Sequence, residues 1–232
     1  MSFDFLRFLT NPAFVLSWYG FGILAAAWTS YDLLIVNRHV ASVLKAVWPI
    51  IIVFFSVIGL IAYIVSCRPS NIGATDEKDA EEVHKEFVSD KWKKVLGSVM
   101  HCVGGDGLGI VTAMVITRWL GLPFWTEFWI EYAAGFAFGW FIFQYWAMRS
   151  MGNNPLESLL KGGRAEFFSM MTLMLGMGLV SRYVTPAVVG HPPTAETAAF
   201  WGFAAFGLLV GTIFTYPMNW WLVSIKWKHG MG

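Results

Sequence analysis

His101, Cys102 and Asp106 are the residues whose types and spacing suggest chemistry, because they lie within six residues of one another. An imidazole, a thiol and a carboxylate are suitable ligands for a soft or borderline metal ion such as copper or zinc. The same groups could instead relay a proton, with Asp106 as the deepest station. Cys102 and Asp106 are four residues apart, so a helix would place both on one face.

Composition indicates that these residues belong to a membrane protein. Of the 232 residues, 56% are hydrophobic and 13% are charged, whereas an ordinary globular domain has about 25% charged residues. The segment Arg68–Lys94 contains 13 of the 31 charged residues. The sequence therefore predicts an all-α fold, a polytopic bundle of membrane-spanning helices that forms a single membrane domain over residues 1–232. The net charge of +1 excludes nucleic-acid binding, which requires a basic surface.

Six apolar runs are long enough to cross the hydrocarbon layer, which takes about 20 residues of helix. The segment 67–94 between the second and third runs is polar, and we expect a partly helical, solvated loop there. The predicted spans are residues 14–36, 43–66, 95–117, 128–148, 167–184 and 198–225.

The distribution of Lys and Arg predicts the orientation of these six spans, because cytoplasmic loops are enriched in positive charge. Twelve of these residues fall on the side of both termini and the long loop, and the other four are Arg38, Lys45, Arg118 and Arg182. The sequence therefore predicts a multi-pass protein of the inner (cytoplasmic) membrane with both termini in the cytoplasm.

The depth of a polar residue decides whether it can reach water. At about 1.5 Å of rise per residue, His101 lies roughly 10 Å below Lys94 and Asp106 roughly 18 Å below it, close to the bilayer centre. Gln144 and Asn219 lie roughly 7–10 Å inside the same face, and Glu166 could lean into this layer. These three residues are the expected supporting polar layer. The remaining span charges lie near helix ends and are expected to be ordinary helix-end charges: Asp32, Arg118, Glu131 and Arg182, with Glu166 as a further candidate.

The third span also has a purely structural interpretation. Gly105 and Gly109 form a small-xxx-small pattern that allows another helix to approach closely. Asp106 could be neutral or hydrogen-bonded in that contact. A metal site, a proton or solute path, and helix packing therefore all remain open for this span.

Several segments together resemble an uncharacterised bacterial membrane family, the domain of unknown function 4396. The resemblance covers nearly the whole chain and is most specific in its last block. It rests on Val47-Trp48-Pro49-Ile50, His101-Cys102 with Gly105, Leu108 and Gly109, Gln144-Tyr145, Ala165-Glu166 with Ser169, and Tyr216-Pro217-Met218-Asn219-Trp220-Trp221-Leu222.

The resemblance implies six helices and no established activity. It also implies that this sequence departs from the family pattern, since Asp106 stands where the family has its second cysteine and Ile110 and Met114 stand at acidic positions. A family polar site would therefore be only partly retained here.

Two functions follow as alternatives. In the first, His101, Cys102 and Asp106 form an intramembrane site, supported by Gln144, Glu166 and Asn219, that handles or transports a transition metal or another small solute. In the second, the protein is a non-catalytic accessory subunit whose aromatic surfaces contact lipids, other membrane subunits or further copies of itself. An enzyme is not expected, because neither a nucleophile–base pair nor a complete metal triad is visible.

Overall fold

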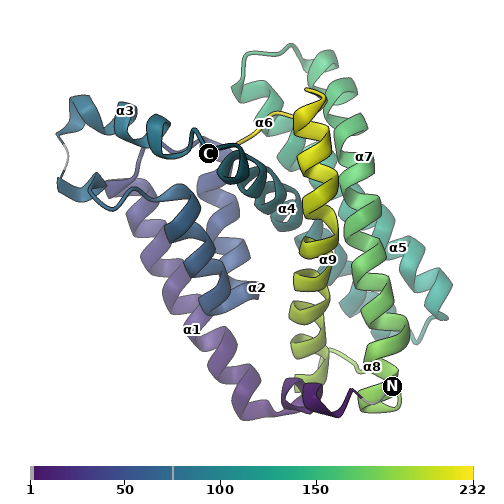
Figure 1. Ribbon diagram of the computed structural model, residues 1–232. Helices are drawn as coiled ribbons and strands as arrows, with labels where there is room; N and C mark the ends of the chain where they lie inside the picture. Colours follow the sequence, from purple (N-terminus) through teal and green to yellow (C-terminus); the bar gives the residue numbers. More distant parts are fainter. Residues whose placement is uncertain (1–2, 75, 232) are drawn as a thin grey trace.

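The structure is a computed structural model that describes residues 3–74 and 76–231. The described residues form helices and short connections with no strand among them, which confirms the all-α prediction. Figure 1 shows long helices packed side by side. The N-terminal half consists of η1 (Asp4–Thr10), α1 (Pro12–Tyr31), η2 (Asp32–Val36), α2 (Ser42–Cys67), η3 (Ile72–Ala74), α3 (Glu77–Phe87) and α4 (Lys91–Trp119). The C-terminal half consists of α5 (Phe124–Ala137), η4 (Phe138–Gln144), α6 (Tyr145–Ser150), α7 (Pro155–Leu179), η5 (Val180–Val184), α8 (Thr185–Val189) and α9 (Ala198–Ser224).

Asn-Pro pairs start two of the long helices. The Asn11 side chain accepts a hydrogen bond from the Ala13 backbone N–H, and Asn154 does the same for Glu157, both at 2.9 Å. The following residues, Pro12 and Pro155, occupy the first helical position, where a missing N–H costs nothing. The α7 helix therefore begins twelve residues before the predicted span at 167, and Glu166 lies well inside it.

Helix α4 is the centre of the bundle and packs against α2, α5, α7 and α9. Its apolar and glycine residues face all directions rather than one stripe, as expected for a helix that other helices surround. At Gly109 a Cβ atom would meet the backbone of Ala134 and Gly135 in α5. The predicted close approach at this glycine is therefore present, and it joins α4 to α5.

Among the described residues, five helices are long and apolar enough to cross a membrane, and the chain is a multi-helix membrane protein. They are Pro12–Val36, Ser42–Cys67, Lys91–Trp119, Pro155–Val189 and Ala198–Ser224. The predicted fourth span, residues 128–148, lies in the continuous helical segment α5–η4–α6 but is not among the five. The count of six spans therefore stays a prediction.

Helix α2 is not a straight rod but a hairpin of two half-helices that turn at Ser56. The rings of Trp48 and Tyr63 have centroids 5.5 Å apart, although fifteen residues of straight helix would separate them by about 22 Å. A Cβ atom at Gly59 would lie 3.0 Å from the Ile52 Cα atom. The chain therefore enters and leaves this hairpin at the same end of the bundle.

The turn of the hairpin depends on an unusual backbone conformation. Ser56 has φ 50° and ψ −126°, a conformation that glycine adopts more easily than any L-residue. Its hydroxyl donates a hydrogen bond to the Trp18 carbonyl at 2.7 Å, and Trp18 Nε1 donates to the Phe54 carbonyl at 2.8 Å. Contacts with α1 thus hold the turn on both sides.

The open end of the hairpin is tied to the end of α1 by a buried polar group. Arg68 forms an ion pair with Asp32 at 2.9 Å, and the Tyr63 hydroxyl donates to the same carboxylate at 2.6 Å. Asn37 donates to the Cys67 carbonyl at 2.9 Å. Asp32 lies near a helix end as expected, but it is buried and paired inside the protein rather than placed at the lipid interface.

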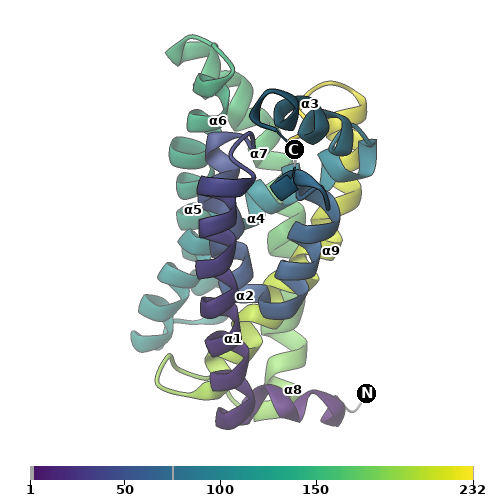
Figure 2. The ribbon, with the colours of Figure 1, turned by 90° about the vertical axis from the view of Figure 1, so that its left-hand side faces the viewer.

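The hairpin changes the expected topology of the termini. Figures 1 and 2 show the N-terminus at one end of the bundle and the C-terminus at the other. The prediction that both termini lie on one side of the membrane requires each of six segments to cross it, and the second of these segments folds back in the structure. Hydropathy has the same value for one straight span and for two packed half-helices, so the sequence pattern could not separate these cases.

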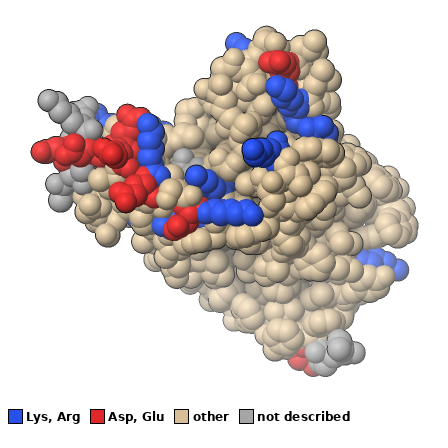
Figure 3. Space-filling view, turned by 45° about the horizontal axis from the view of Figure 1, so that its top comes forward, with Lys and Arg blue, Asp and Glu red and all other residues tan. Residues whose placement is uncertain are grey.

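Positive charge gathers at the end of the bundle that carries α3 and the C-terminus. By backbone position, thirteen of the sixteen Lys and Arg residues lie there, and only Arg7, Arg118 and Arg182 lie at the opposite end. Figure 3 shows many of them in a view turned toward this end. The fold thus separates positive charge more completely than the twelve-to-four division expected for six straight spans.

Candidate functional site: a buried thiol and carboxyl cluster

The three residues singled out on the third predicted span all lie in the core. His101, Cys102 and Asp106 are on α4 and have exposed fractions of 1%, 2% and 0%. Their depth places them among apolar helices, where an ionisable side chain is costly and is retained for a reason.

Cys102, Asp106 and Glu166 form the centre of what we call the thiol cluster, completed by Ser169, Asn219 and Lys228. One ligand atom from each of the first three residues lies within 4.8 Å of the others. The Cys102 thiol donates a hydrogen bond to Glu166 Oε2 at 3.1 Å. The carboxyl groups of Asp106 and Glu166 lie close together, and such a contact is stable with one shared proton, because two ionised carboxylates repel and can only accept hydrogen bonds.

Lys228 brings a positive charge to the thiol cluster. Its ammonium donates hydrogen bonds to Cys102 Sγ at 2.6 Å, Asn219 Oδ1 at 2.6 Å and Ser169 Oγ at 3.0 Å. Burial by itself lowers the pKa of Lys228, but the neighbouring Cys102 and Glu166 outweigh it and the pKa is raised above its ordinary value. Three hydrogen-bond acceptors surround the Lys228 nitrogen, as a protonated ammonium with three N–H donors requires.

The chain after α9 positions Lys228 by turning back toward the bundle. Lys226 adopts a left-handed backbone with φ 59°, and the Met231 N–H donates to the Lys94 carbonyl at 3.0 Å. The guanidinium of Arg164 lies 3.9 Å from the centre of the Trp227 ring. The last residues thus cover the end of α4 and direct the Lys228 side chain inward.

Helices α7 and α9 fix the remaining members of the thiol cluster. Ser169 Oγ donates to Asn219 Oδ1 at 3.2 Å, and Asn219 Nδ2 donates to the Thr215 carbonyl at 3.0 Å. Thr215 Oγ1 in turn donates to the Ser169 carbonyl at 2.9 Å. These bonds hold the amide of Asn219 with its oxygen toward Lys228.

The sequence suggested His101 as a donor beside Cys102 and Asp106, but in the structure the His101 side chain contacts other residues. Its Nε2 atom lies 3.1 Å from Gln144 Oε1, and its ring packs edge-on against Phe143. Glu166 takes the third position beside Cys102 and Asp106 instead. Of the expected supporting layer, Glu166 and Asn219 therefore join the cluster, whereas Gln144 pairs with His101.

Gly139 gives the two carboxyl groups their space. A Cβ atom at this position would overlap Asp106 Oδ1 and Glu166 Oε1. Gly139 lies in the π-helical segment η4, whose extra residue per turn changes which side chains face α4. Apart from their contact with each other, Glu166 Oε1 and both oxygens of Asp106 receive no hydrogen bond from any described residue.

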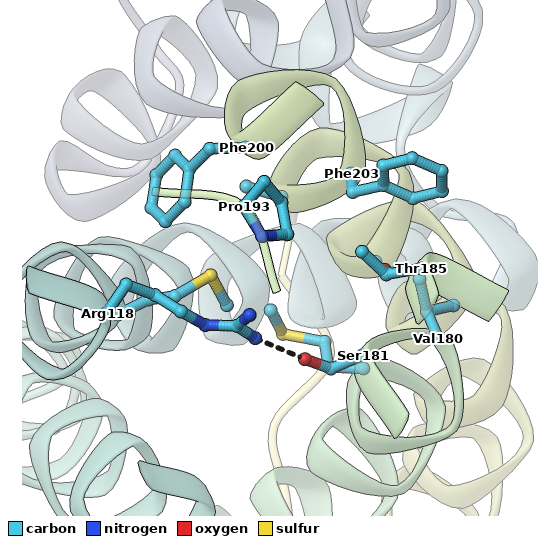
Figure 4. A pocket seen from close by; sticks show the side chains of 11 residues that line it. Arg118, Val180, Ser181, Thr185, Pro193, Phe200 and Phe203 are labelled. Atoms are coloured by element: carbon cyan, nitrogen blue, oxygen red, sulfur yellow. Dashed lines mark hydrogen bonds between the residues drawn. The ribbon is translucent and has the colours of Figure 1, made fainter. Parts of the chain in front are cut away.

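A second buried group of charges, the arginine cluster, lies at the opposite end of α4. It consists of Thr117, Arg118, Glu127, Glu131 and Ser181. Arg118 Nε is 2.5 Å from Glu127 Oε1, and Arg118 donates from its terminal nitrogen to Ser181 Oγ at 2.7 Å. Figure 4 shows Arg118 and Ser181 joined by this bond beside Pro193 and Phe200. Arg118 and Glu131 were expected as helix-end charges, and the structure buries both of them.

Sequence reasoning missed Lys228, because a lysine four residues beyond a membrane helix normally marks the cytoplasmic face. It counted Lys228 only as a topological charge. The one local signal is that Asn219 and Lys228 are polar residues on either side of a tryptophan-rich helix end. They come together only because the chain reverses at Lys226, and the sequence does not show this reversal.

The donor set fits the chemistry of a soft or borderline divalent metal. A thiolate and carboxylates are ligands of zinc, and zinc bonds to them at about 2.0–2.3 Å. Donor atoms that surround such an ion lie at most about twice this distance apart, and one ligand atom from each of the three residues lies within 4.8 Å of the others. The carboxyl pair could equally exchange its shared proton with a neighbour.

The fold and the cluster define a multi-helix membrane protein with ionisable groups buried among its helices. Residues 91–228 match a known family, and the chain belongs to it: the family is the domain of unknown function 4396. The matched segment contains every residue of both clusters, whereas α1, α2 and the motif Val47–Ile50 lie outside it. No curated protein and no solved structure matches the chain.

Proposed function

We propose that this protein binds a transition-metal ion, zinc or copper, at the thiol cluster inside the membrane and handles that ion there. The observation that carries the proposal is the group of Cys102, Asp106 and Glu166, fully buried and within 4.8 Å of one another, with three carboxyl oxygens that lack a donor from the described protein. Acceptor oxygens in such surroundings are stable only beside a cation, which is either a proton or a metal ion.

The charges of the cluster support an exchange of protons for metal. With a neutral thiol, one proton shared by the two carboxyl groups and the Lys228 ammonium, the group is neutral. A divalent ion that replaces the thiol proton and the shared proton leaves the group neutral again. Lys228 is thus the fixed positive charge that makes this exchange electroneutral, and a neutral group is far less costly in a low-dielectric interior.

The distribution of charge supports an orientation for this site. Thirteen of the sixteen Lys and Arg residues lie at the end that carries α3 and the C-terminus, and positively charged segments favour the cytoplasm. We therefore place the C-terminus and α3 in the cytoplasm, the N-terminus on the outer side of the inner (cytoplasmic) membrane, and the thiol cluster in the cytoplasmic half.

Metal content of the purified protein tests the proposal directly. Wild type is compared with Cys102→Ser, Asp106→Asn and Glu166→Gln after incubation with zinc or copper and removal of excess metal. Cys67→Ser is the matched control, because Cys67 is also a buried free thiol but lies beside Asp32 at the hairpin. We expect the three cluster variants to lose metal and the control to retain it.

Two results would overturn the metal site. One is wild type that takes up neither metal, and the other is cluster variants that hold as much metal as Cys67→Ser. If the wild type takes up no metal but its folded state binds and releases a proton through Asp106 and Glu166, the cluster serves proton passage instead.

The alternative of an accessory subunit is favoured by one surface. A groove of about 240 Å³ between α5 and the α7–η5 segment is lined by Phe124, Trp125, Phe128 and Tyr183, and Trp125 is 66% exposed. Aromatic side chains of this kind are frequent contacts in protein interfaces. On this alternative, Trp125→Ala releases a stoichiometric partner chain or a second copy of the protein from native membranes, while metal content is unchanged.

A further inference from the structure

An apolar cavity lies between the turn of the α2 hairpin and the N-terminal end of the bundle. Its volume is about 270 Å³, and its walls come from η1, the start of α1, the turn of α2 and the first half of α9. Phe8, Trp18, Phe55, Ile58, Ala205 and Leu209 are among the lining residues.

The cavity exists because the hairpin is shorter than its neighbours. Helix α2 turns back beside Trp18, whereas α1 continues to Pro12 and α9 begins at Ala198. Figure 1 shows α1 and α9 continuing past the hairpin toward the N-terminal end. A straight second span would have filled this layer with side chains.

The walls of the cavity offer no partner to water. Trp18 Nε1 and the Tyr19 hydroxyl, which are polar groups on lining residues, donate to the backbone carbonyls of Phe54 and Trp201. A buried water needs two to four polar partners. The cavity therefore favours an apolar occupant.

Two walls of the cavity, η1 and α9, are already in contact, so the cavity cannot close by bringing these two elements closer. At Gly202 a Cβ atom would overlap the Leu9 carbonyl oxygen, which shows that η1 is already pressed against the α9 backbone. An unfilled apolar void forfeits the dispersion contacts of the atoms around it.

The cavity is continuous with the surface that contacts lipid. Phe8 and Ile58 both line it and are 46% and 41% exposed. The apolar helices of this protein contact membrane lipid, and acyl chains are the most abundant apolar groups at that surface. An apolar cavity of about 150 Å³ accommodates benzene, so this one is large enough for a segment of several carbon atoms.

We propose that the cavity under the α2 hairpin binds an acyl chain of one membrane phospholipid from the leaflet at the N-terminal end. The chain segment in the cavity replaces the side chains that a straight span would supply. The headgroup remains at the interface, beside η1. The site is independent of the thiol cluster and of the function proposed for it.

Retention of lipid after purification tests this proposal. Ala205→Phe places a ring in the cavity, and the matched control is Ala27→Phe, since Ala27 is exposed on the apolar helix α1 and does not line the cavity. Each protein is exchanged into detergent, washed until bulk lipid is absent and examined by native mass spectrometry. We expect wild type and Ala27→Phe to keep a bound phospholipid and Ala205→Phe to lose it.

A second variant and a second measurement protect the test against misfolding. Ile58→Trp narrows the mouth of the cavity rather than filling its interior, and a phosphatidylglycerol or phosphatidylethanolamine titration followed by the thermal unfolding midpoint measures binding without isolation of the complex. We expect added phospholipid to raise the midpoint of wild type more than that of either cavity variant. Wild type without retained phospholipid, equal retention in Ala205→Phe, or a retained molecule that is not a phospholipid would each overturn the proposal.

Discussion

The thiol cluster and the arginine cluster have the same formal contents, two carboxyl groups and one basic side chain, but arrange them differently. In the arginine cluster the guanidinium of Arg118 touches the Glu127 carboxylate directly, and Thr117 lies within hydrogen-bond reach of both glutamates. In the thiol cluster the Lys228 ammonium contacts a thiol, a hydroxyl and an amide oxygen. No carboxylate is among its hydrogen-bond acceptors within the described residues.

This difference indicates which cluster is complete within the protein. The ion pair of Arg118 with Glu127, together with one proton on Glu131, makes the arginine cluster neutral, so it can hold α4, α5 and η5 together without a metal ion. The thiol cluster leaves its carboxyl oxygens facing each other around a shared proton. It is therefore the cluster at which a cation can enter, and the position of the basic group is what separates the two roles.

Among the variants that test this difference between the clusters, removal of the Arg118 side chain should change the stability of the fold the most. We expect Arg118→Met to destabilise the fold by about 3–5 kcal/mol, because the buried Glu127 carboxylate then loses its counter-charge. Thermal unfolding in detergent measures the change. Arg182→Met serves as the control, since Arg182 lies near the same end but is exposed. A loss of stability equal to that of the control would mean that the arginine cluster does not hold the helices together.

Metal binding should depend steeply on pH at the thiol cluster. Two protons leave for each divalent ion on the proposed charge balance, so we expect the affinity to rise about 100-fold per pH unit while both protons are still bound. Zinc titrations at several pH values measure this slope. Calorimetry in buffers of different ionisation enthalpy counts the protons released. A zinc affinity that does not change with pH would show that metal binding releases no protons, although the metal site itself would stand.

Replacement of Lys228 should change the proton count. In Lys228→Met the fixed charge is absent, so we expect both carboxyl groups to be protonated without metal. Full ligation of a divalent ion then releases about three protons and leaves a net charge of −1, so we also expect weaker metal binding than in wild type. The fold should lose about 1.5–3 kcal/mol, the usual contribution of hydrogen bonds to a charged group. Lys226→Met is the control, because Lys226 is exposed. An unchanged proton count would show that Lys228 does not set the charge of the cluster.

The smallest effect should come from Gly139. We expect Gly139→Ala to cost about 1–3 kcal/mol, as overpacking of a core does, and to weaken metal binding by forcing the two carboxyl groups apart. Gly20→Ala provides the comparison, since a Cβ atom at Gly20 meets nothing within 4 Å. If metal affinity in Gly139→Ala equals that of the Gly20 variant, the space at Gly139 is irrelevant to the site.

The long helices and their approximate limits could be predicted from sequence, because hydropathy reports which residues leave water. The predicted Val95–Thr117 lies inside α4, and the predicted Ala198–Ile225 differs from α9 by one residue. Counting residues from the helix ends also placed Glu166 and Asn219 at about the same depth in the bundle as Cys102. This worked because the rise per residue of a helix is constant.

The reversals of the chain could not be predicted in the same way. The turn at Ser56 and the turn at Lys226 depend on tertiary contacts, with Trp18 in one case and with Lys94 and Arg164 around the last residues in the other. Hydropathy shows which residues avoid water, but it does not show where the chain changes direction. The contact between His101 and Gln144 could not be predicted either, because it depends on how the π-helical segment η4 rotates the Gln144 side chain toward α4.

The α2 hairpin has a consequence for how the protein enters the membrane. This segment has the highest mean hydropathy of the five candidate spans, yet its two halves fold back on each other at Ser56. Insertion machinery that responds to hydropathy would pass it straight through, which would invert every later helix. The ion pair of Arg68 with Asp32 holds the second half-helix beside the end of α1, and we propose that this contact opposes straight insertion of α2. We expect charge-removing changes at Arg68 to yield molecules of both orientations.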